Sequence, residues 1–219
     1  MMVGAGNSFE IQKFIRKLNH QCGFMKYLKL EEELLYDGSQ IKPQWVFREF
    51  GVKDSSIVRW IGPMDIHQDN IVDYEDQGKE IKGSKLLHFI IEHFDSQPAS
   101  LRLCYHRQRL FILLVQDNLE KLGLKTIREG DDLYHITGQE KKAKLSVSIA
   151  TSSHNSMKIH FAVNISSEGT PSDVEITSLN DCIEGMTMED VNQLADSIVD
   201  DYVSELSSIE RDITKTKVF

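Results

Sequence analysis

The sequence lacks the features that define several large protein classes. Its 219 residues contain no apolar run near the ~20 residues needed to cross a bilayer, and its beginning has no signal-peptide hydrophobic region. We therefore expect a cytoplasmic protein that is not embedded in a membrane. No GxGxxG, P-loop or nucleophile-elbow motif is present, so the dinucleotide-binding, P-loop NTPase and α/β-hydrolase classes have no motif support.

Cysteine and net positive charge are also scarce. The cysteines Cys22, Cys104 and Cys182 are an odd number without CxxC spacing, so we expect buried thiols rather than a disulfide framework or a zinc site. Lys and Arg number 25 against 34 Asp and Glu, which gives a formal net charge of −9. Broad nucleic-acid binding is not expected, because it needs clustered cations to displace counterions.

The apolar content of 40% is enough for one folded domain. Asn7 and Glu10 resemble a capping box, followed by apolar residues at helical spacing, so residues 1–26 are expected to form an N-terminal helical extension. The core is expected over residues 27–186 and an amphipathic C-terminal helix, capped by Thr187, over 187–213. We expect these three segments to form a single domain.

Within the core, residues 27–36 satisfy neither the helical nor the strand period, and both alternatives remain open. Helices are predicted over 43–50, over 84–94 with Ser84 as cap, and over 105–122. Strands are predicted over 56–61, 125–128, 132–136, 145–151 and 158–166. This order indicates an α+β fold, in which a largely antiparallel sheet carries helices on one face and a ligand cleft on the other.

The last two predicted strands alternate between apolar and small polar residues. Leu145, Val147 and Ile149 form an apolar face in the first strand, and Ile159, Phe161 and Val163 form one in the second. We expect the remaining residues to form a joint polar platform for a ligand, with Ser146, Ser148, His160 and Asn164 as contacts. The alternative is the exposed face of an ordinary half-buried hairpin. A pocket is expected between this platform and residues 64–76.

Motifs in the second half resemble the biotin and lipoate protein ligases, whose core has an Asn-Asp strand, a hairpin, a strand-opening Lys and a Gly-Ile-Asn-Val strand. The corresponding runs here are Asp131-Asp132-Leu133-Tyr134, Lys144-Leu145 and Ala162-Val163-Asn164-Ile165. Over nearly the full length, runs such as YDGSQIKPQW, IVRWIGPMDI and LLHFIIEHF are similar to an uncharacterised family catalogued as domain of unknown function 366. This resemblance implies the fold of class II aminoacyl-tRNA synthetases and biotin synthetases, with no established activity.

The ligase resemblance assigns the catalytic role to Lys144, which would contact the carboxylate of the acid and the phosphate of the adenylate. It also places Asp132 in the same ligand site. A flexible cation suits developing negative charge at such a place. The alternative is that Lys144 belongs to a solvated, lysine-rich turn.

Further candidates come from residue type and spacing. Asp73 and Glu75, in an acidic segment, are candidates for Mg²⁺, or else form a solvated loop. Arg107 and Arg109 can clamp a carboxylate or phosphate, or lie as rim charges. Other ligand-binding candidates, in the polar run before the first core helix, are Asp37, Ser39 and Gln40, with Trp45 nearby. His88 and Glu92 are interpreted as a surface ion pair on the helix predicted over 84–94.

One departure from the ligases argues against adenylation by ATP and Mg²⁺. Their glycine- and arginine-rich phosphate segment corresponds to residues 63–76, which are acidic here. Two hypotheses remain: a ligase-like or transferase-like enzyme acting on a small carboxylate or acyl-nucleotide, or a non-catalytic module for a metabolite, a modified base or an RNA end. By analogy with the fold, a homodimer is expected, joined through residues 9–18 and 45–50.

Overall fold

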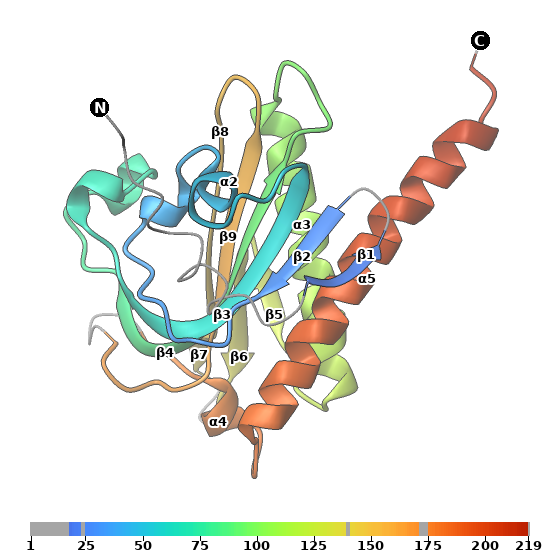
Figure 1. Cartoon of the computed structure of the whole chain (residues 1–219). Coiled ribbons are helices and arrows are strands. Elements are labelled where there is room, and N and C mark those ends of the chain that lie inside the picture. Colours follow the sequence, from blue (N-terminus) through green and yellow to red (C-terminus); the bar gives the residue numbers. More distant parts are fainter. Residues whose placement is uncertain (1–17, 23–24, 139–140, 171–174, 219) are drawn as a thin grey trace.

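A six-stranded, mainly antiparallel sheet organises the protein (Figure 1). The computed structural model describes residues 18–22, 25–138, 141–170 and 175–218. Only β2 and β3 run parallel among the paired strands of this sheet. The predicted class, α+β with a largely antiparallel sheet, is confirmed. Across the sheet the order is β1 (Leu18–Cys22), β2 (Met25–Lys29), β3 (Ser55–Asp65), β4 (Lys82–His93), β9 (Met157–Asn164) and β8 (Ser146–Ser152).

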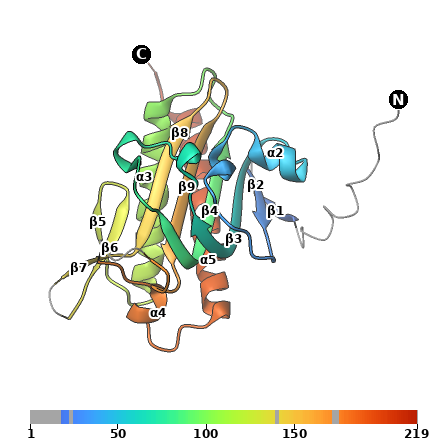
Figure 2. The same cartoon turned by 90° about the vertical axis from the view of Figure 1, so that its left-hand side faces the viewer.

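Two long helices cover one face of this sheet, α3 (Leu101–Lys121) and α5 (Met188–Lys215), as Figures 1 and 2 both show. Their inward residues, such as Phe111 and Tyr202, share one core with strand residues such as Phe161. Helix α5 begins where the sequence predicts: Thr187 and Asp190 form a complete capping box. Helix α3 begins four residues before the prediction, at a cap formed by Ser100.

The opposite face of the sheet carries a second core. Trp60, Ile90 and Ala162 pack there against residues of the segment 30–50, including Tyr36 and Trp45. This segment contains the short 3-10 helix η1 (Ser39–Ile41) and helix α2 (Trp45–Phe50), which ends at Gly51 as predicted. The open question about residues 27–36 resolves into strand β2 and an irregular stretch that ends in a bridge from Tyr36 to Met64.

The helix predicted over residues 84–94 is wrong, because this stretch is strand β4, in the middle of the sheet. Leu87, Phe89 and Ile91 face the helices, whereas Leu86 and Ile90 belong to the second core. A strand buried on both faces has an almost continuous apolar run, which does not distinguish it from a buried helix. The strand period is therefore hidden in the sequence.

Two predicted boundaries also differ. Strand β3 continues past Gly62-Pro63 to Asp65, through an irregular register between Gly62 and Met64. The N-terminal helical extension falls mostly on residues 1–17, which lie outside the described residues. Its described end, residues 18–22, is strand β1 instead of helix.

A smaller sheet and several short elements complete the protein. Strands β5 (Ile127–Glu129), β6 (Asp132–Ile136) and β7 (Lys142–Lys144) pair antiparallel beside the end of β8 (Figure 2). The segment between β3 and β4 holds two 3-10 turns, η2 (Gln68–Asn70) and η3 (Tyr74–Asp76), and α4 (Leu179–Cys182) precedes α5. No helix in the described ranges has the length and apolarity to span a membrane.

Candidate functional site

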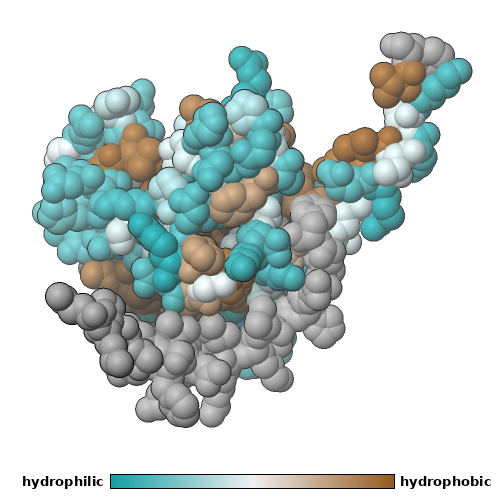
Figure 3. All heavy atoms as spheres, turned by 45° about the horizontal axis from the view of Figure 1, so that its top comes forward, coloured by the Kyte–Doolittle hydropathy of each residue, from teal (hydrophilic) through white to brown (hydrophobic). Residues whose placement is uncertain are grey.

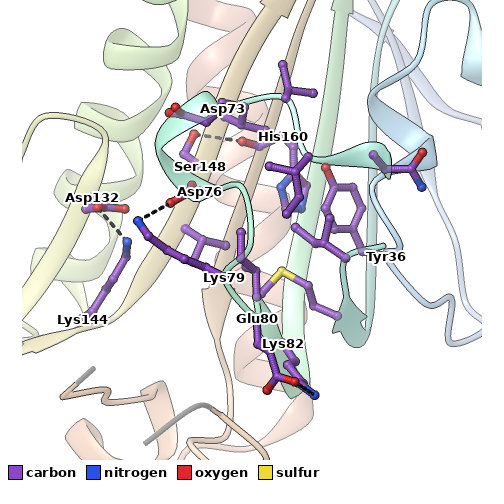
Figure 4. A pocket seen from close by; sticks show the side chains of 18 of the residues that line it. Tyr36, Asp73, Asp76, Lys79, Glu80, Lys82, Asp132, Lys144, Ser148 and His160 are labelled. Carbon is purple, nitrogen blue, oxygen red and sulfur yellow. Dashed lines mark hydrogen bonds and ion pairs between the residues drawn. The ribbon is translucent and has the colours of Figure 1, made fainter. Parts of the chain in front are cut away.

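A cavity of about 410 Å³ lies on the face of the sheet that α3 and α5 leave uncovered (Figure 4). Its cover is the segment between β3 and β4, which contributes apolar side chains such as Ile66, Ile71 and Val72. Strands β8 and β9 form its floor, and β6 and β7 supply a charged end. The location matches the pocket expected beside residues 64–76.

The prediction that the serines of β8 form the polar platform is wrong. The pairing of β8 with β9 instead places the apolar residues of β8 beside His160. Val147 lies opposite Ala162, and Ile149 lies opposite His160, so these residues share the face of the cavity. Ser146 is buried outside the cavity lining, where its hydroxyl accepts the Leu133 N–H at 2.9 Å. The apolar side chains of β8 thus form the floor.

Ser148 lies on the face of the sheet that α3 covers, but it still reaches the edge of the cavity. Its hydroxyl accepts a hydrogen bond from Gln108 Nε2 of α3 at 2.8 Å and donates one to the His160 carbonyl at 2.9 Å. Both bonds are internal to the protein. Ser148 therefore anchors helix α3 to the floor of the cavity rather than presenting a free hydroxyl.

Lys144 and Asp132 form the charged end of the cavity. The Nζ atom of Lys144 lies 2.8 Å from Oδ2 of Asp132, and both residues belong to the lining. Figure 4 shows the two side chains pointing toward one another from neighbouring strands β7 and β6. Burial raises the pKa of the Asp132 carboxyl, and the charge of Lys144 only partly opposes this. Both residues, which the ligase resemblance assigns to one site, therefore lie at the same end of the cavity.

The lining as a whole is acidic. It contains six carboxylates against three lysines, and each of these lysines already has a carboxylate partner. Lys79 lies 3.0 Å from Asp76, and Lys82 lies 3.1 Å from Glu80. A phosphate cradle needs free cations or backbone N–H donors, and the three lysines of the described lining are not free cations. The six carboxylates belong to Asp73, Glu75, Asp76, Glu80, Asp131 and Asp132.

The metal site proposed from Asp73 and Glu75 receives no support from the geometry. The Asp73 carboxylate accepts the Glu75 N–H at 2.9 Å and so caps the turn η3. Across the described ranges, no three His, Cys, Asp or Glu side chains converge in the way that holds a metal ion. Asp73 therefore stabilises the turn of its own acidic segment.

Two buried histidines and a tyrosine lie under the other end of the cavity. His160 and Tyr36 are only 2% and 1% exposed, and their rings stack with centroids 3.6 Å apart. His160 Nε2 lies 3.1 Å from His88 Nδ1, and His88 Nε2 lies 3.1 Å from the Gly62 carbonyl oxygen. Burial lowers the pKa of His88 to about 3 and lowers that of His160 well below its usual value.

The interpretation of His88 and Glu92 as a surface ion pair is wrong, since both residues are buried in β4. The Glu92 carboxylate accepts from the Ser156 hydroxyl at 2.7 Å and from the Gln44 N–H at 2.9 Å. His88 was missed as a member of the site. The available signal was a polar residue, His88, inside an apolar run. Because this stretch was predicted as a helix, His88 was expected on its exposed face.

Asn164 lies on the cavity face of β9, as predicted. Its side-chain nitrogen donates to the Thr177 carbonyl at 3.1 Å and approaches the Lys144 carbonyl at 3.5 Å. The first contact ties β9 to the segment after residue 174, and the second ties it to the end of β7. The amide oxygen of Asn164 faces away from both carbonyl groups.

Several predicted ligand contacts lie outside the lining. Arg107 makes a two-pronged ion pair with Asp95, with both N–O distances 2.7 Å. Arg109 pairs with Asp131 at 3.3 Å and so stands behind the rim. The polar run before α2 is occupied with its own turn: the Asp37 carboxylate accepts the Ser39 N–H, Gln40 donates to the Leu35 carbonyl, and Trp45 is buried in the second core.

Comparison with known proteins agrees with this architecture. An uncharacterized protein of Methanocaldococcus jannaschii is 33% identical over 199 residues, which is 88% of this chain and 85% of that protein. A solved protein of unknown function from Pyrococcus horikoshi has a TM-score of 0.78 at 32% identity, covering 89% of this chain and 99% of that chain.

Structures of lower identity share the fold. The biotin protein ligase of Aquifex aeolicus in complex with biotin and ATP has a TM-score of 0.52 at 13% identity, covering 82% of this chain and 68% of that chain. A lipoate protein ligase of Thermoplasma acidophilum has the same TM-score at 12% identity, covering 81% and 84%. These likenesses show a biotin and lipoate ligase-like fold. The model of one family matches residues 25–217, and the chain belongs to that family, described as Domain of unknown function (DUF366).

Proposed function

We propose that the protein binds a small organic acid in the cavity, holds its carboxylate or activated acyl group at Lys144, and acts on it as a ligase-like or transferase-like enzyme. The observation that carries this proposal is the position of Lys144, whose side chain lies at the charged end of the cavity, next to the floor that Val147 and Ile149 make apolar. A carboxylate there forms a charge-assisted hydrogen bond in a partly desolvated site. The fold shared with biotin and lipoate ligases supports the same substrate class.

The proposed binding event is an exchange of partners. In the described structure Lys144 is held by Asp132, whose pKa is already raised by burial. A ligand carboxylate approaching Lys144 competes with Asp132 and adds a second negative charge. Two carboxylates at one site favour protonation of one of them, so the bound acid and Asp132 would share a proton. Binding should therefore strengthen as the pH falls toward the range in which carboxyl groups titrate.

The first prediction concerns Lys144→Ala. We expect this variant to bind short-chain carboxylic acids about 10- to 100-fold more weakly, which corresponds to the ~1.5–3 kcal/mol of a charged hydrogen bond. Isothermal titration calorimetry with a panel of acids of increasing chain length provides the measurement. The matched control is Lys142→Ala, because Lys142 lies two residues away on β7, pairs with Glu129 and is not part of the lining. Equal affinities in the two variants would contradict the assignment.

A second candidate function is a binding module that keeps the fold without adenylation and recognises a metabolite, a nucleobase or an RNA end. The pairing of every described lysine in the lining with a carboxylate favours it. A thermal-shift screen with ATP and Mg²⁺, carboxylic acids and nucleobases separates the two functions. Stabilisation by ATP together with pyrophosphate exchange supports the enzyme, whereas stabilisation by a nucleobase or acid alone supports the module.

We also propose that the protein is a cytoplasmic homodimer. The free thiols of Cys104 and Cys182 suit a reducing compartment. Of the two apolar stretches expected at the dimer interface, residues 9–17 lie outside the described ranges and Trp45 is buried, but Phe47 is exposed. Light scattering gives the mass of the protein in solution.

A further inference from the structure

We infer that His160 presents a fixed hydrogen-bond acceptor to the cavity, so that the ligand carries an uncharged N–H or O–H group at this end. The inference takes from the proposed function only that the cavity is a ligand site. It rests on the chain of contacts that runs from the Gly62 carbonyl through His88 to His160.

The chain determines which ring nitrogens carry protons. The carbonyl oxygen of Gly62 is an acceptor, so Nε2 of His88 must donate to it. A neutral imidazole carries one N–H, and Nδ1 of His88 is therefore a bare acceptor. Its partner at 3.1 Å, Nε2 of His160, must donate, which leaves Nδ1 of His160 with a free lone pair.

Both rings are held in place and uncharged. Tyr36 stacks on His160 at an interplanar angle of 8°, and Trp60 stacks on His88 with centroids 4.9 Å apart and an angle of 13°. His88 is fully buried and His160 is 2% exposed, so desolvation opposes a positive charge on either ring. The neutral state is the one in which the proton order above holds.

The free nitrogen of His160 opens onto the cavity. Nδ1 has no partner among the described residues, and His160 belongs to the lining. Among the described residues, three fully enclosed side-chain atoms have no hydrogen-bond partner: Gln40 Oε1, His93 Nδ1 and Thr126 Oγ1. Nδ1 of His160 is not one of these enclosed atoms, and because His160 lines the cavity, we place this nitrogen at the cavity surface. Figure 4 shows the imidazole beside Tyr36 at the base of the cavity.

Asn164 extends the same pattern along β9. Because its nitrogen faces two carbonyl groups, its oxygen is a second acceptor that faces away from them. His160 and Asn164 lie on one face of the strand, about 13 Å apart at ~3.3 Å per residue. Only the methyl group of Ala162 lies between them on this face. The floor therefore offers acceptors at two points.

This polarity sets the direction of a bound acid. A carboxylate at the His160 end would meet a lone pair, which is repulsive, whereas at the Lys144 end it meets a cation. The carboxylate of the proposed ligand thus lies toward Lys144 and its neutral N–H or O–H group toward His160. A simple fatty acid, which has no such donor, would leave His160 Nδ1 unpaired in the complex.

Nitrogen NMR on protein with ¹⁵N-labelled histidine tests the proton order without any ligand. We expect His88 and His160 to be neutral at pH 7 and protonated on Nε2, as read from two-bond ¹H–¹⁵N correlations. A proton on Nδ1 of His160 overturns the inference. His88→Phe keeps a ring in place but removes the acceptor, and should give His160 a mixture of both tautomers. Tyr36→Phe, which keeps the stack, should leave the tautomer unchanged. If His88→Phe does not fold, the wild-type spectrum decides alone.

A matched pair of probes tests recognition. 2-Piperidone carries an N–H beside its carbonyl, and cyclohexanone has the same ring and carbonyl without the N–H. At millimolar concentration we expect 2-piperidone to shift the His160 Nδ1 resonance and cyclohexanone not to shift it. His93, a buried histidine bonded to Tyr202 and outside the lining, is the internal control. Equal shifts, or no shift with either probe, overturn the inference.

Neither probe has a carboxylate, so this result is independent of Lys144. Loss of acid binding in Lys144→Ala together with no selectivity between the probes would remove the acceptor role of His160 alone. Selectivity between the probes with unchanged acid binding in Lys144→Ala would remove the proposed carboxylate site alone.

Discussion

At Gly62 two chain segments approach one another closely behind the histidine chain. A Cβ atom added there would lie 2.3 Å from the carbonyl oxygen of Leu34. That oxygen also accepts the indole N–H of Trp60 at 2.8 Å, and the Gly62 carbonyl itself accepts from His88. Even a methyl group at this position must therefore displace backbone.

We expect Gly62→Ala to lower the free energy of unfolding by about 1–3 kcal/mol, because the added atom overpacks a rigid backbone contact. Urea denaturation followed by circular dichroism measures this. Gly138→Ala is the matched control, since an added Cβ at Gly138 has no heavy atom within 4 Å. It should change stability by no more than about 0.5 kcal/mol. Similar losses in both variants would show that the close approach is not the cause.

Arg107, expected from the sequence to bind a ligand, instead forms an ion pair whose effect depends on pH. Burial works to raise the pKa of Asp95, but the hydrogen bonds and charge of Arg107 outweigh it, so the pKa lies below its ordinary value of 3.8. A carboxyl group with a lowered pKa in the folded state stabilises the protein above the unfolded pKa. This contribution is lost as the pH falls through the folded pKa.

Asp95→Asn should therefore be less stable than the wild type by about 1–2 kcal/mol above pH ~4, where the charged hydrogen bonds are complete. The difference should disappear toward pH ~2. Urea midpoints across this range for both proteins provide the measurement. A constant difference in stability over the whole pH range would mean that Asp95 stabilises the protein through packing and not through its charge.

At the scale of elements, the prediction of helices and strands from sequence succeeded where local hydrogen bonds determine the structure. It failed where packing against distant residues determines it. The start of α5 follows from Thr187 and Asp190, whose reciprocal hydrogen bonds need no distant partner. Strand β4 was mistaken for a helix because its burial on both faces depends on the rest of the sheet. The faces of β8 were mistaken for a similar reason, since the alternation of one strand does not fix its register with the next.

The cap of α5 gives a prediction at this scale. Thr187→Ala removes the hydroxyl that accepts the Asp190 N–H and donates to its carboxylate. We expect a loss of about 1 kcal/mol in thermal or urea unfolding. Thr214→Ala, near the other end of the same helix, is the control, because its exposed hydroxyl bonds only to the Arg211 carbonyl. An equal effect of the two changes would argue against the cap.

At the scale of the whole molecule, the sequence indicated the fold class and the presence of Lys144 and Asn164 beside a cavity. It did not indicate that Tyr36, His88 and His160 meet, because they come from three separate segments joined only by the sheet order. The projecting end of α5 was also not foreseen. Figure 3 shows it standing out from the body, with Ile209 and Ile213 among its exposed apolar residues.

The cover of the cavity and its floor differ in how they are held. The turns η2 and η3 contain no buried residue, and few main-chain bonds tie the segment down, such as Ile66 N–H to the Ile81 carbonyl and His67 N–H to the Asp37 carbonyl. Every residue of β9, in contrast, is buried. The free energy of opening should thus be small for the cover and close to the global value for the floor.

Amide hydrogen exchange followed by mass spectrometry should show this as two populations, with residues 68–80 exchanging long before β4 and β9. Uniform protection of both would contradict it. A ligand can then enter and leave through local opening, while the sheet that orients its polar groups stays folded. Residence time in the cavity becomes a property of the cover, and selectivity a property of the floor, so that each can be changed by substitution without the other.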